Sequence, residues 1–239
     1  MRIISRLDIK NNNLIKSIKF DGVRKIGDPK KFAKNYYEKK LDEIFLINNT
    51  GSLYGTKLDV SLIKEIRSIV SIPITSGGGI SSVNDSECLI KNGSEKIVIN
   101  SLIHTNLNEF KKIISLLGSS SVVGSIQYSS EKKYLTYYKM GRELTGYDLI
   151  DTIKFYQDIG CGEILVTDIC RDGKYTGLDK ALYDILNKFY DIPILIGGGF
   201  KSFDEIDYFK DVASAIVSSS TLHFNKINLN NIYDVKKFL

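Results

Sequence analysis

Two glycine triplets are the first residues in this sequence whose type and spacing indicate chemistry. The triplets at 77–79 and 197–199 each follow a short apolar run and precede a segment with helical character. Glycine permits positive φ and lets backbone N–H groups approach a bound anion, and the N-terminus of a following helix favours negative charge. Small polar residues with further donors follow the next apolar run in both places: Asn100, Ser101, Ser218, Ser219 and Ser220. Each triplet therefore predicts a phosphate-binding half-site.

An alternative for either triplet is that its glycines merely allow a strand and a helix to pack closely. The two triplets match in sequence context and in polar neighbours, which favours the phosphate interpretation. If both half-sites face one mouth, the predicted ligand is a molecule with a phosphate at each end.

An internal duplication accounts for this match. Residues 71–82 return at 191–202 with an offset of 120, as Pro73 and Pro193 show. Further pairs follow at an offset of 120 or 119: Glu43-Ile44 with Glu163-Ile164, Leu58-Asp59 with Leu178-Asp179, and the stretch 97–104 with 216–223. Co-linear matches at half the chain length indicate two similar halves, about 1–120 and 121–239.

The elements that must position these residues alternate between strands and helices. Strands are predicted at 2–8, 43–48, 72–76, 96–100, 121–127, 163–168, 192–196 and 213–218. Apolar residues recur at helical spacing between them, at 62–70, 107–117 and 182–189. Two equal halves of four β/α units predict a single-domain (β/α)8 TIM barrel over 1–239, with an open doubly wound sheet as the alternative. The longest irregular stretches are predicted at 15–29, 49–58, 128–146 and 169–178, on the face where active sites of such barrels lie.

Composition limits the other classes of function. Of 239 residues, 43% are hydrophobic, and 33 basic residues are interleaved with 28 acidic ones. The resulting charge of +5 favours anionic ligands. The basic residues form no continuous stripe, so no nucleic-acid partner is predicted. No apolar run approaches the ~18 residues of a membrane span, and the N-terminus lacks a signal peptide. A cytoplasmic protein without a membrane partner is expected.

Neither a metal nor a cofactor is predicted. The three cysteines, Cys88, Cys161 and Cys170, form no CxxC pair, so free and mostly buried thiols are expected. His104 and His223 occupy equivalent positions in separate halves, which makes a poor metal-ligand set and favours polar roles in the core or in loops.

Motifs along the whole chain resemble those of one known family, the cyclase subunit of imidazole glycerol phosphate synthase (HisF). They are Arg-Leu-Asp-Ile-Lys at 6–10, Gly-Asp-Pro at 27–29, Ser-Gly-Gly-Gly-Ile at 76–80, Ile-Asn-Ser at 99–101, Gly-Glu-Ile-Leu-Val-Thr at 162–167, Arg-Asp-Gly at 171–173, Thr-Gly-Leu-Asp at 176–179 and Leu-His-Phe at 222–224. The resemblance implies a barrel that pairs with a HisH-like glutaminase, receives ammonia through its interior and uses it on a bisphosphorylated substrate. It also implies phosphate contacts at Gly79, Asn100, Ser101, Gly173, Gly199, Ser219 and Ser220.

The catalytic positions of the family are only half matched. The resemblance implies two aspartates, at the ends of the first and fifth strands, acting as general acid and base. Asp8 matches the first, but Gln127 stands at the second, and a carboxamide does not titrate near neutral pH. Lys16, at the end of the first mobile loop, is retained.

Other mouth positions have also changed. Asn48 and Cys170 stand where the family has aspartates, and Arg6 replaces an uncharged neighbour of the first aspartate. Thr50 and Asp172 match the family, so an anionic substrate is still expected.

The opposite end of the predicted barrel matches the family completely. The resemblance implies an ammonia entrance made of alternating charges, and Arg2, Glu43, Lys96 and Glu163 stand at four strand starts. Charge-assisted pairs around the barrel axis are expected, with simple solvated strand starts as the alternative.

Three functions follow. The first is a divergent paralogue that delivers ammonia for amidation, forming an acetamidino group on a sugar of a bacterial surface polysaccharide or glycan, together with a sugar amidotransferase. The second is a genuine cyclase, a lyase of histidine biosynthesis. The third is a non-catalytic scaffold that activates the glutaminase. The sister isomerase of histidine synthesis is less favoured, because it needs two carboxylates and lacks the entrance ring.

Overall fold

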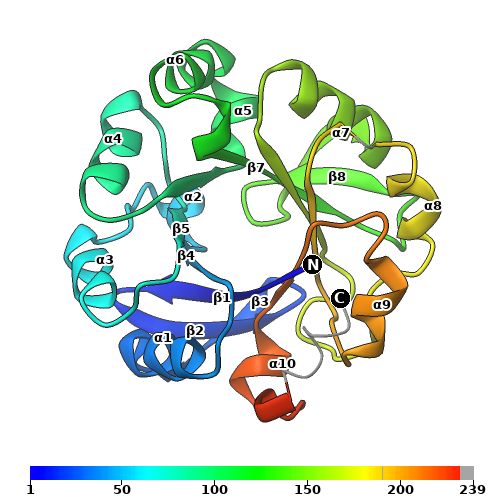
Figure 1. Ribbon diagram of the computed structural model, residues 1–239. Helices are drawn as coiled ribbons and strands as arrows, with labels where there is room; N and C mark the ends of the chain where they lie inside the picture. The colour runs from blue at the N-terminus through cyan, green and yellow to red at the C-terminus, as the bar shows by residue number, and fades with distance from the viewer. Residues whose placement is uncertain (190, 232–239) are drawn as a thin grey trace.

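Eight parallel strands close into a barrel in the computed structural model, which describes residues 1–189 and 191–231 (Figure 1). The barrel strands are β1 Arg2–Lys10, β4 Glu43–Asn48, β5 Ile74–Gly77, β6 Lys96–Ile99, β7 Val122–Tyr128, β10 Glu163–Asp168, β11 Ile194–Gly197 and β12 Ala215–Ser218. The barrel is closed because β12 pairs with β1 and β7 pairs with β10, both in parallel. The predicted barrel is confirmed, and every predicted strand overlaps an observed one.

Helices form a ring outside the strands (Figure 1). They are α1 Pro29–Glu38, α2 Gly51–Tyr54, α3 Val60–Arg67, α4 Val83–Lys91, α5 Ser101–Thr105, α6 Leu107–Leu117, α7 Leu149–Asp158, α8 Leu182–Leu186, α9 Asp204–Phe209 and α10 Ser220–His223, with 3-10 turns at Ser119–Ser121 and Leu229–Asn231. Side-chain caps fix several helix starts: Asp28 accepts from the Lys30 N–H, Asp59 from the Ser61 N–H, and Ser82 forms a capping box with Asp85. Among residues 1–189 and 191–231, no helix is long and apolar enough to cross a membrane.

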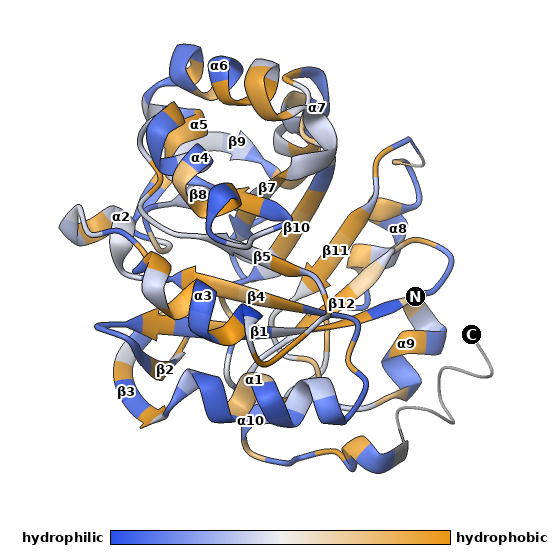
Figure 2. Cartoon of the chain, turned by 60° about the vertical axis from the view of Figure 1, so that its left-hand side comes forward, coloured by the Kyte–Doolittle hydropathy of each residue, from blue (hydrophilic) through white to orange (hydrophobic). Residues whose placement is uncertain are grey.

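Two apolar clusters hold the barrel together. The larger lies between the strands and the surrounding helices, and the smaller fills the barrel interior. The interior cluster consists of Ile4, Phe45, Val98, Val123, Leu165, Leu195, Ala215 and Val217. The barrel strands are largely orange in Figure 2, whereas the helices alternate between apolar and polar residues. Because successive side chains of a strand point to opposite faces, Ile4 points inward while Ile3 packs against the helices.

Two β-hairpins replace irregular segments predicted at 15–29 and 128–146. Strands β2 Asn13–Ile18 and β3 Asp21–Gly27 extend β1, and β8 Leu135–Tyr138 and β9 Glu143–Asp148 extend β7, all in antiparallel pairing. The two-residue turn Lys19-Phe20 has positive φ at both positions, as such hairpin turns require. The turn between β8 and β9 has four residues, 139–142, and positive φ at Lys139, Met140 and Gly141. Neither turn has the Asn-Gly or Asp-Gly pair, so the strongest hairpin signal was missing from the sequence of both turns. The prediction of irregular loops at these two places was wrong.

The first glycine triplet lies so close to a neighbouring backbone segment that a side chain would not fit. A matched pair of substitutions can test this. Gly78 has φ +92°, and a Cβ there would lie 2.1 Å from the Asn48 carbonyl oxygen. Gly146 has nearly the same φ, +89°, but open space around its Cβ position. Gly146→Ala should therefore lower the free energy of unfolding by only ~1–2 kcal/mol, the cost of a left-handed backbone conformation for a residue with a Cβ. Gly78→Ala should cost a further ~1–3 kcal/mol from overpacking.

Urea unfolding of both variants measures the difference. Equal losses of unfolding free energy would contradict the close approach at Gly78.

Candidate functional site

A buried ion pair occupies the centre of the barrel mouth. Arg6 and Asp8 lie on the same strand face as the interior residue Ile4, so both point into the barrel. Arg6 Nε donates to Asp8 Oδ1 at 2.8 Å, and the two residues are 8% and 2% exposed. A carboxylate at the expected catalytic position is therefore present, but a guanidinium is already bound to it.

Lys16 and Asp172 complete this cluster. Lys16 Nζ lies 2.9 Å from Asp172 Oδ2 and 3.9 Å from Asp8 Oδ2. Burial lowers the pKa of Arg6, but Asp8 and Asp172 outweigh this effect and raise it above its ordinary value. Two cations and two carboxylates thus balance one another within the mouth. Lys16 lies in β2, paired with β1, and not in a mobile loop as predicted.

Gln127 points into the same mouth and is held by the second hairpin. It lies on the strand face of Val123, which belongs to the interior cluster. Its Oε1 accepts a hydrogen bond from the Gly141 N–H at 2.7 Å, and the residue is 8% exposed. The amide therefore fixes the turn between β8 and β9 against the barrel.

The half-site of the first half of the chain is a cavity of about 300 Å³. It contains the three predicted phosphate-binding residues of this half, Gly79, Asn100 and Ser101, and also Arg6 and Gln127. Other polar residues lining it are Asn48, Asn49, Lys57, Ser81, Ser125 and Lys139. A cavity of this size falls at the lower end of small-molecule sites, ~300–1,000 Å³.

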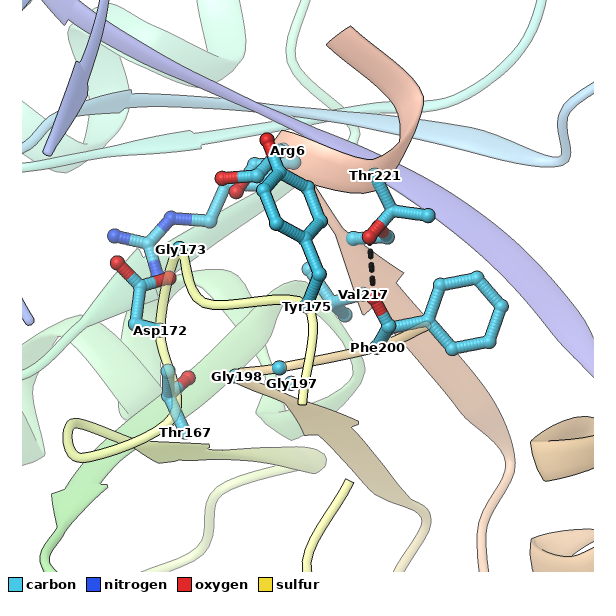
Figure 3. Close-up of a pocket in the computed structure, with 14 residues that line it drawn as sticks. Arg6, Thr167, Asp172, Gly173, Tyr175, Gly197, Gly198, Phe200, Val217 and Thr221 are labelled. Carbon is cyan, nitrogen blue, oxygen red and sulfur yellow. Dashed lines mark hydrogen bonds between the residues drawn. The ribbon is translucent and has the colours of Figure 1, made fainter. Parts of the chain in front are cut away.

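The half-site of the second half is far smaller, about 20 Å³, as the structure stands (Figure 3). The predicted residues Gly173, Gly199, Ser219 and Ser220 line it, together with Arg6, Asp172 and Tyr175. Thr221 Oγ1 donates to the Phe200 carbonyl oxygen at its edge. Space of this size holds little more than one water molecule.

The remaining predicted mouth residues divide between the cavity and its surroundings. Asn48 lines the larger cavity, and its Nδ2 donates to Thr56 Oγ1 at 3.1 Å. Thr50 Oγ1 donates to Asn48 Oδ1 at 3.4 Å but lines neither half-site. Cys170 is buried beside Ser129, with 3.1 Å between Sγ and Oγ, and also lies outside both linings.

The sequence interpretation missed one buried carboxylate at the end of β10. Asp168 accepts hydrogen bonds from Ser130 Oγ at 2.7 Å and from the Cys170 N–H at 2.9 Å, and Arg171 Nε lies 3.3 Å away. Burial raises the pKa of Asp168, although these hydrogen bonds act in the opposite direction. Its position at the carboxyl end of the predicted strand 163–168 could have marked it as a candidate site residue.

At the opposite end of the barrel, the four predicted entrance residues form one connected ion cluster. Arg2 bridges Glu43 and Glu163, at 2.8 Å to each, and Lys96 Nζ lies 3.0 Å from Glu163. Thr75 Oγ1 donates to Glu43 Oε1 at 2.5 Å. Burial raises the pKa of Glu43, against the lowering effects of Thr75, Lys96 and Arg2. We call this set of Arg2, Glu43, Lys96 and Glu163 the floor cluster.

The floor cluster lies one layer below the apolar interior. Each member stands two residues before an interior residue on the same strand: Arg2 before Ile4, Glu43 before Phe45, Lys96 before Val98 and Glu163 before Leu165. Because a spacing of two keeps side chains on one strand face, the charges point toward the barrel axis. Simple solvated strand starts do not describe this arrangement.

Both histidines form hydrogen-bonding contacts with tyrosines of the core, and two of the three cysteines are buried. His104 Nε2 lies 3.0 Å from Tyr156 Oη, and His223 Nδ1 lies 2.6 Å from Tyr36 Oη. Burial lowers the pKa of His104 to about 4 and that of His223 to about 3. The part of the chain that the structure describes holds no cluster of three or more His, Cys, Asp or Glu suited to a metal ion. The cysteines are free, with Cys88 exposed and the other two buried.

Comparison with known proteins assigns the whole barrel to one family. Residues 2–228 match the family described as histidine biosynthesis protein. The chain is 35% identical to the imidazole glycerol phosphate synthase subunit HisF of Legionella pneumophila, over 87% of this chain and 99% of the relative. It is 35% identical to HisF of Lactococcus lactis subsp. cremoris, over 97% and 91% of the two chains, and 33% identical to HisF of Sulfolobus acidocaldarius, over 100% and 95%.

The buried histidines predict a loss of stability in mild acid. Below pH 6.5 the unfolded histidines bind protons, whereas folded His104 and His223 stay neutral until about pH 4 and about pH 3. Their contribution to stability is therefore complete above pH 6.5 and is lost as the pH falls toward those values. Each histidine should add up to ~1.4 kcal/mol per pH unit to the slope of unfolding free energy against pH.

Urea unfolding between pH 7 and pH 5 should give a smaller slope for His104→Gln than for the wild type, and the smallest for the double variant with His223→Gln. Identical slopes in all three proteins would refute the assignment.

Proposed function

Because the chain belongs to the histidine biosynthesis protein family and matches cyclase subunits of the HisF type along its length, we propose that it receives ammonia from a HisH-like glutaminase and passes it through the barrel. We further propose that the acceptor is a sugar of a bacterial surface polysaccharide or glycan. Ammonia would there form an acetamidino group, with a separate sugar amidotransferase activating the sugar. A cytoplasmic location accords with this role.

The state of the two catalytic positions carries the proposal. In the cyclase reaction implied by the resemblance, one group gives a proton while another takes one on the opposite side of the substrate. Here Asp8 is bound by Arg6 at 2.8 Å, so its carboxylate is already engaged in a buried charge-assisted pair. Gln127 does not titrate, and its oxygen is already engaged by Gly141. Neither position is prepared for proton transfer, which supports a changed acceptor chemistry.

The floor cluster and the apolar interior support continued delivery of ammonia. Neutral ammonia crosses an apolar layer at far lower cost than the ammonium ion, because burying an unpaired charge is very unfavourable. A layer of apolar residues, from Ile4 and Phe45 to Val217, lies above the floor cluster. Thr75, which pairs with Phe45, is buried and donates to Glu43 of the floor cluster. Such a layer would select ammonia over ammonium while the charged floor docks a glutaminase. A phosphorylated small molecule at the mouth accords with the glycine-lined half-sites.

A genuine histidine-pathway cyclase, a lyase, is the second candidate. Lys16 supports it, because its Nζ lies 3.9 Å from Asp8 and 2.9 Å from Asp172, which places a titratable group next to the first aspartate. In that case Lys16 would take the proton-transfer role that Gln127 cannot fill.

A non-catalytic scaffold that activates the glutaminase is the third candidate. Asp8→Asn distinguishes it from the other two, because a scaffold would keep its biological output when that carboxylate becomes an amide.

Cyclase activity supplied with ammonium ions tests the altered acceptor chemistry without any glutaminase. General acid and base groups contribute ~10²–10⁴ in rate. With the ribulosyl substrate of imidazole glycerol phosphate synthase, the wild type should therefore be at least ~10²-fold slower than HisF of Lactococcus lactis. The double variant Arg6→Ala with Gln127→Asp should be faster than either single variant, since it frees one carboxylate and restores the other.

A wild-type rate equal to that of the relative would refute the proposal and favour the lyase. Growth of a cyclase-deficient histidine auxotroph on this gene would lead to the same conclusion.

The floor cluster can be tested in cells that lack the chromosomal copy. Mass spectrometry of the surface glycan should show loss of the amidine substituent, restored by the wild type and by Lys91→Met, whose side chain is exposed on α4. Lys96→Met should fail to restore it, because Glu163 loses its second cation. Added ammonium salt should rescue Lys96→Met, since unprotonated ammonia then reaches the mouth from solvent. An unchanged glycan in the deletion strain, accompanied by histidine auxotrophy, would exclude the sugar acceptor.

A further inference from the structure

Arg6 stands between the two half-sites. Among the described residues it alone lines both the larger cavity and the smaller one. Figure 3 shows it at the smaller cavity, beside Asp172. Its Nε binds Asp8, and its Nη2 donates to Asn49 Oδ1 at 3.2 Å. A guanidinium held on two sides and 8% exposed is a fixed part of the wall and not a mobile surface group.

Phe20 packs against the guanidinium of Arg6. It lies at the turn between β2 and β3, is 2% exposed, and its ring centroid is 5.7 Å from Arg6 Cζ. A guanidinium at this distance from an aromatic ring is attracted by a cation–π interaction. Because Phe20 has φ +63°, the hairpin turn itself sets the position of its ring.

The second hairpin meets the first over the same point. A Cβ at Gly141 would lie 3.4 Å from the Phe20 ring and 3.2 Å from Ile169, so the turn between β8 and β9 is in close contact with both. Arg142 and Asp21 form an ion pair between the two hairpins, and Lys19 Nζ lies 3.5 Å from Glu131 Oε1. Arg6 is therefore the side chain between the two half-sites, and Phe20, which lines neither of them, packs against it beneath the two hairpins.

The two half-sites on either side of Arg6 differ in what they can hold. The larger cavity, about 300 Å³, offers the backbone of Gly79, the side chains of Ser101, Lys57 and Lys139, and a free amide donor. That donor is Asn49 Nδ2, which is buried and has no hydrogen-bond partner among the described residues. The smaller cavity, about 20 Å³, holds little more than one water molecule. An adjoining cavity of about 330 Å³ shares Gly173, Tyr175 and Ser220 with it but is not lined by Arg6.

We propose that the half-sites are separate compartments divided by Arg6, which Phe20 holds in place, and that the larger one binds a small molecule carrying a single phosphate group. This deepens the proposed function, on which it rests in taking the mouth as the acceptor site. A bisphosphate reaching both half-sites would have to displace Arg6, leaving Asp8 with only Lys16 at 3.9 Å. Arg6 thus selects against the doubly phosphorylated substrate that the duplicated half-sites by themselves suggest.

Isothermal titration calorimetry of the full chain with two probes tests this. Ribose 5-phosphate represents the monoester, and the ribulosyl bisphosphate substrate of imidazole glycerol phosphate synthase represents the bridging ligand. The wild type should bind both probes with dissociation constants within about threefold of each other, because the second phosphate finds no site. If the second phosphate were bound by charged hydrogen bonds, the bisphosphate would bind about tenfold or more tightly than the monoester. Arg6→Ala should bind the bisphosphate at least tenfold more tightly than the monoester.

Four further variants make the result specific. Arg24→Ala removes an exposed arginine from β3 and should keep the wild-type ratio. Phe20→Ala should change the ratio in the same direction as Arg6→Ala, and it carries the test if Arg6→Ala does not fold. Ser101→Ala should weaken monoester binding, whereas Ser220→Ala, its counterpart in the smaller cavity, should not.

A wild type that prefers the bisphosphate by tenfold or more would overturn the partition, as would absence of monoester binding or an unchanged ratio in both Arg6→Ala and Phe20→Ala. These titrations contain neither glutaminase nor glutamine. Failure of ammonia delivery would therefore leave their outcome intact, and failure of the partition would leave the floor-cluster experiment intact.

Discussion

The charge pair between Arg6 and Asp8 is the interaction on which the rest of the mouth depends. Both groups are more than nine-tenths buried, and removing either partner would leave an uncompensated buried charge. Lys16 and Asp172 then balance the cluster, and Phe20 closes over the guanidinium. The position of the first hairpin, the separation of the two half-sites and the engagement of the first-strand carboxylate all follow from this pair.

The floor of the barrel keeps the residues expected for the family, whereas the mouth does not. At the floor, all four expected charges are present and connected through Arg2 and Glu163. At the mouth, an amide stands at Gln127 and a guanidinium at Arg6, although both lie on strands that match the family. A barrel tolerates such changes because side chains at the carboxyl ends of strands contribute little to the packing of the interior. Acceptor chemistry can therefore change while the route beneath it stays the same.

The two hairpins link fold and specificity. Each continues a barrel strand beyond the mouth, and each carries a turn with left-handed residues, Phe20 in one and Met140 in the other. Their contact across the mouth makes a cover out of segments more than 100 residues apart in the sequence, as the ion pair of Asp21 and Arg142 shows. The duplication supplies the equivalent β7 and β1 from which these hairpins extend.

The sequence by itself determined the eight barrel strands, the duplication, the glycine triplets and the charges of the floor. These features are local or repeat at a fixed spacing, so periodicity and residue type suffice to read them. The tertiary structure decided what the side chains do: that Arg6 holds Asp8, that Gln127 accepts from Gly141, and that the histidines pair with tyrosines. Such contacts join residues as distant as Tyr36 and His223, and only closure of the barrel brings them together. The hairpins also required the structure, because Lys19, Phe20, Lys139 and Met140 adopt positive φ although none of them is a glycine or asparagine.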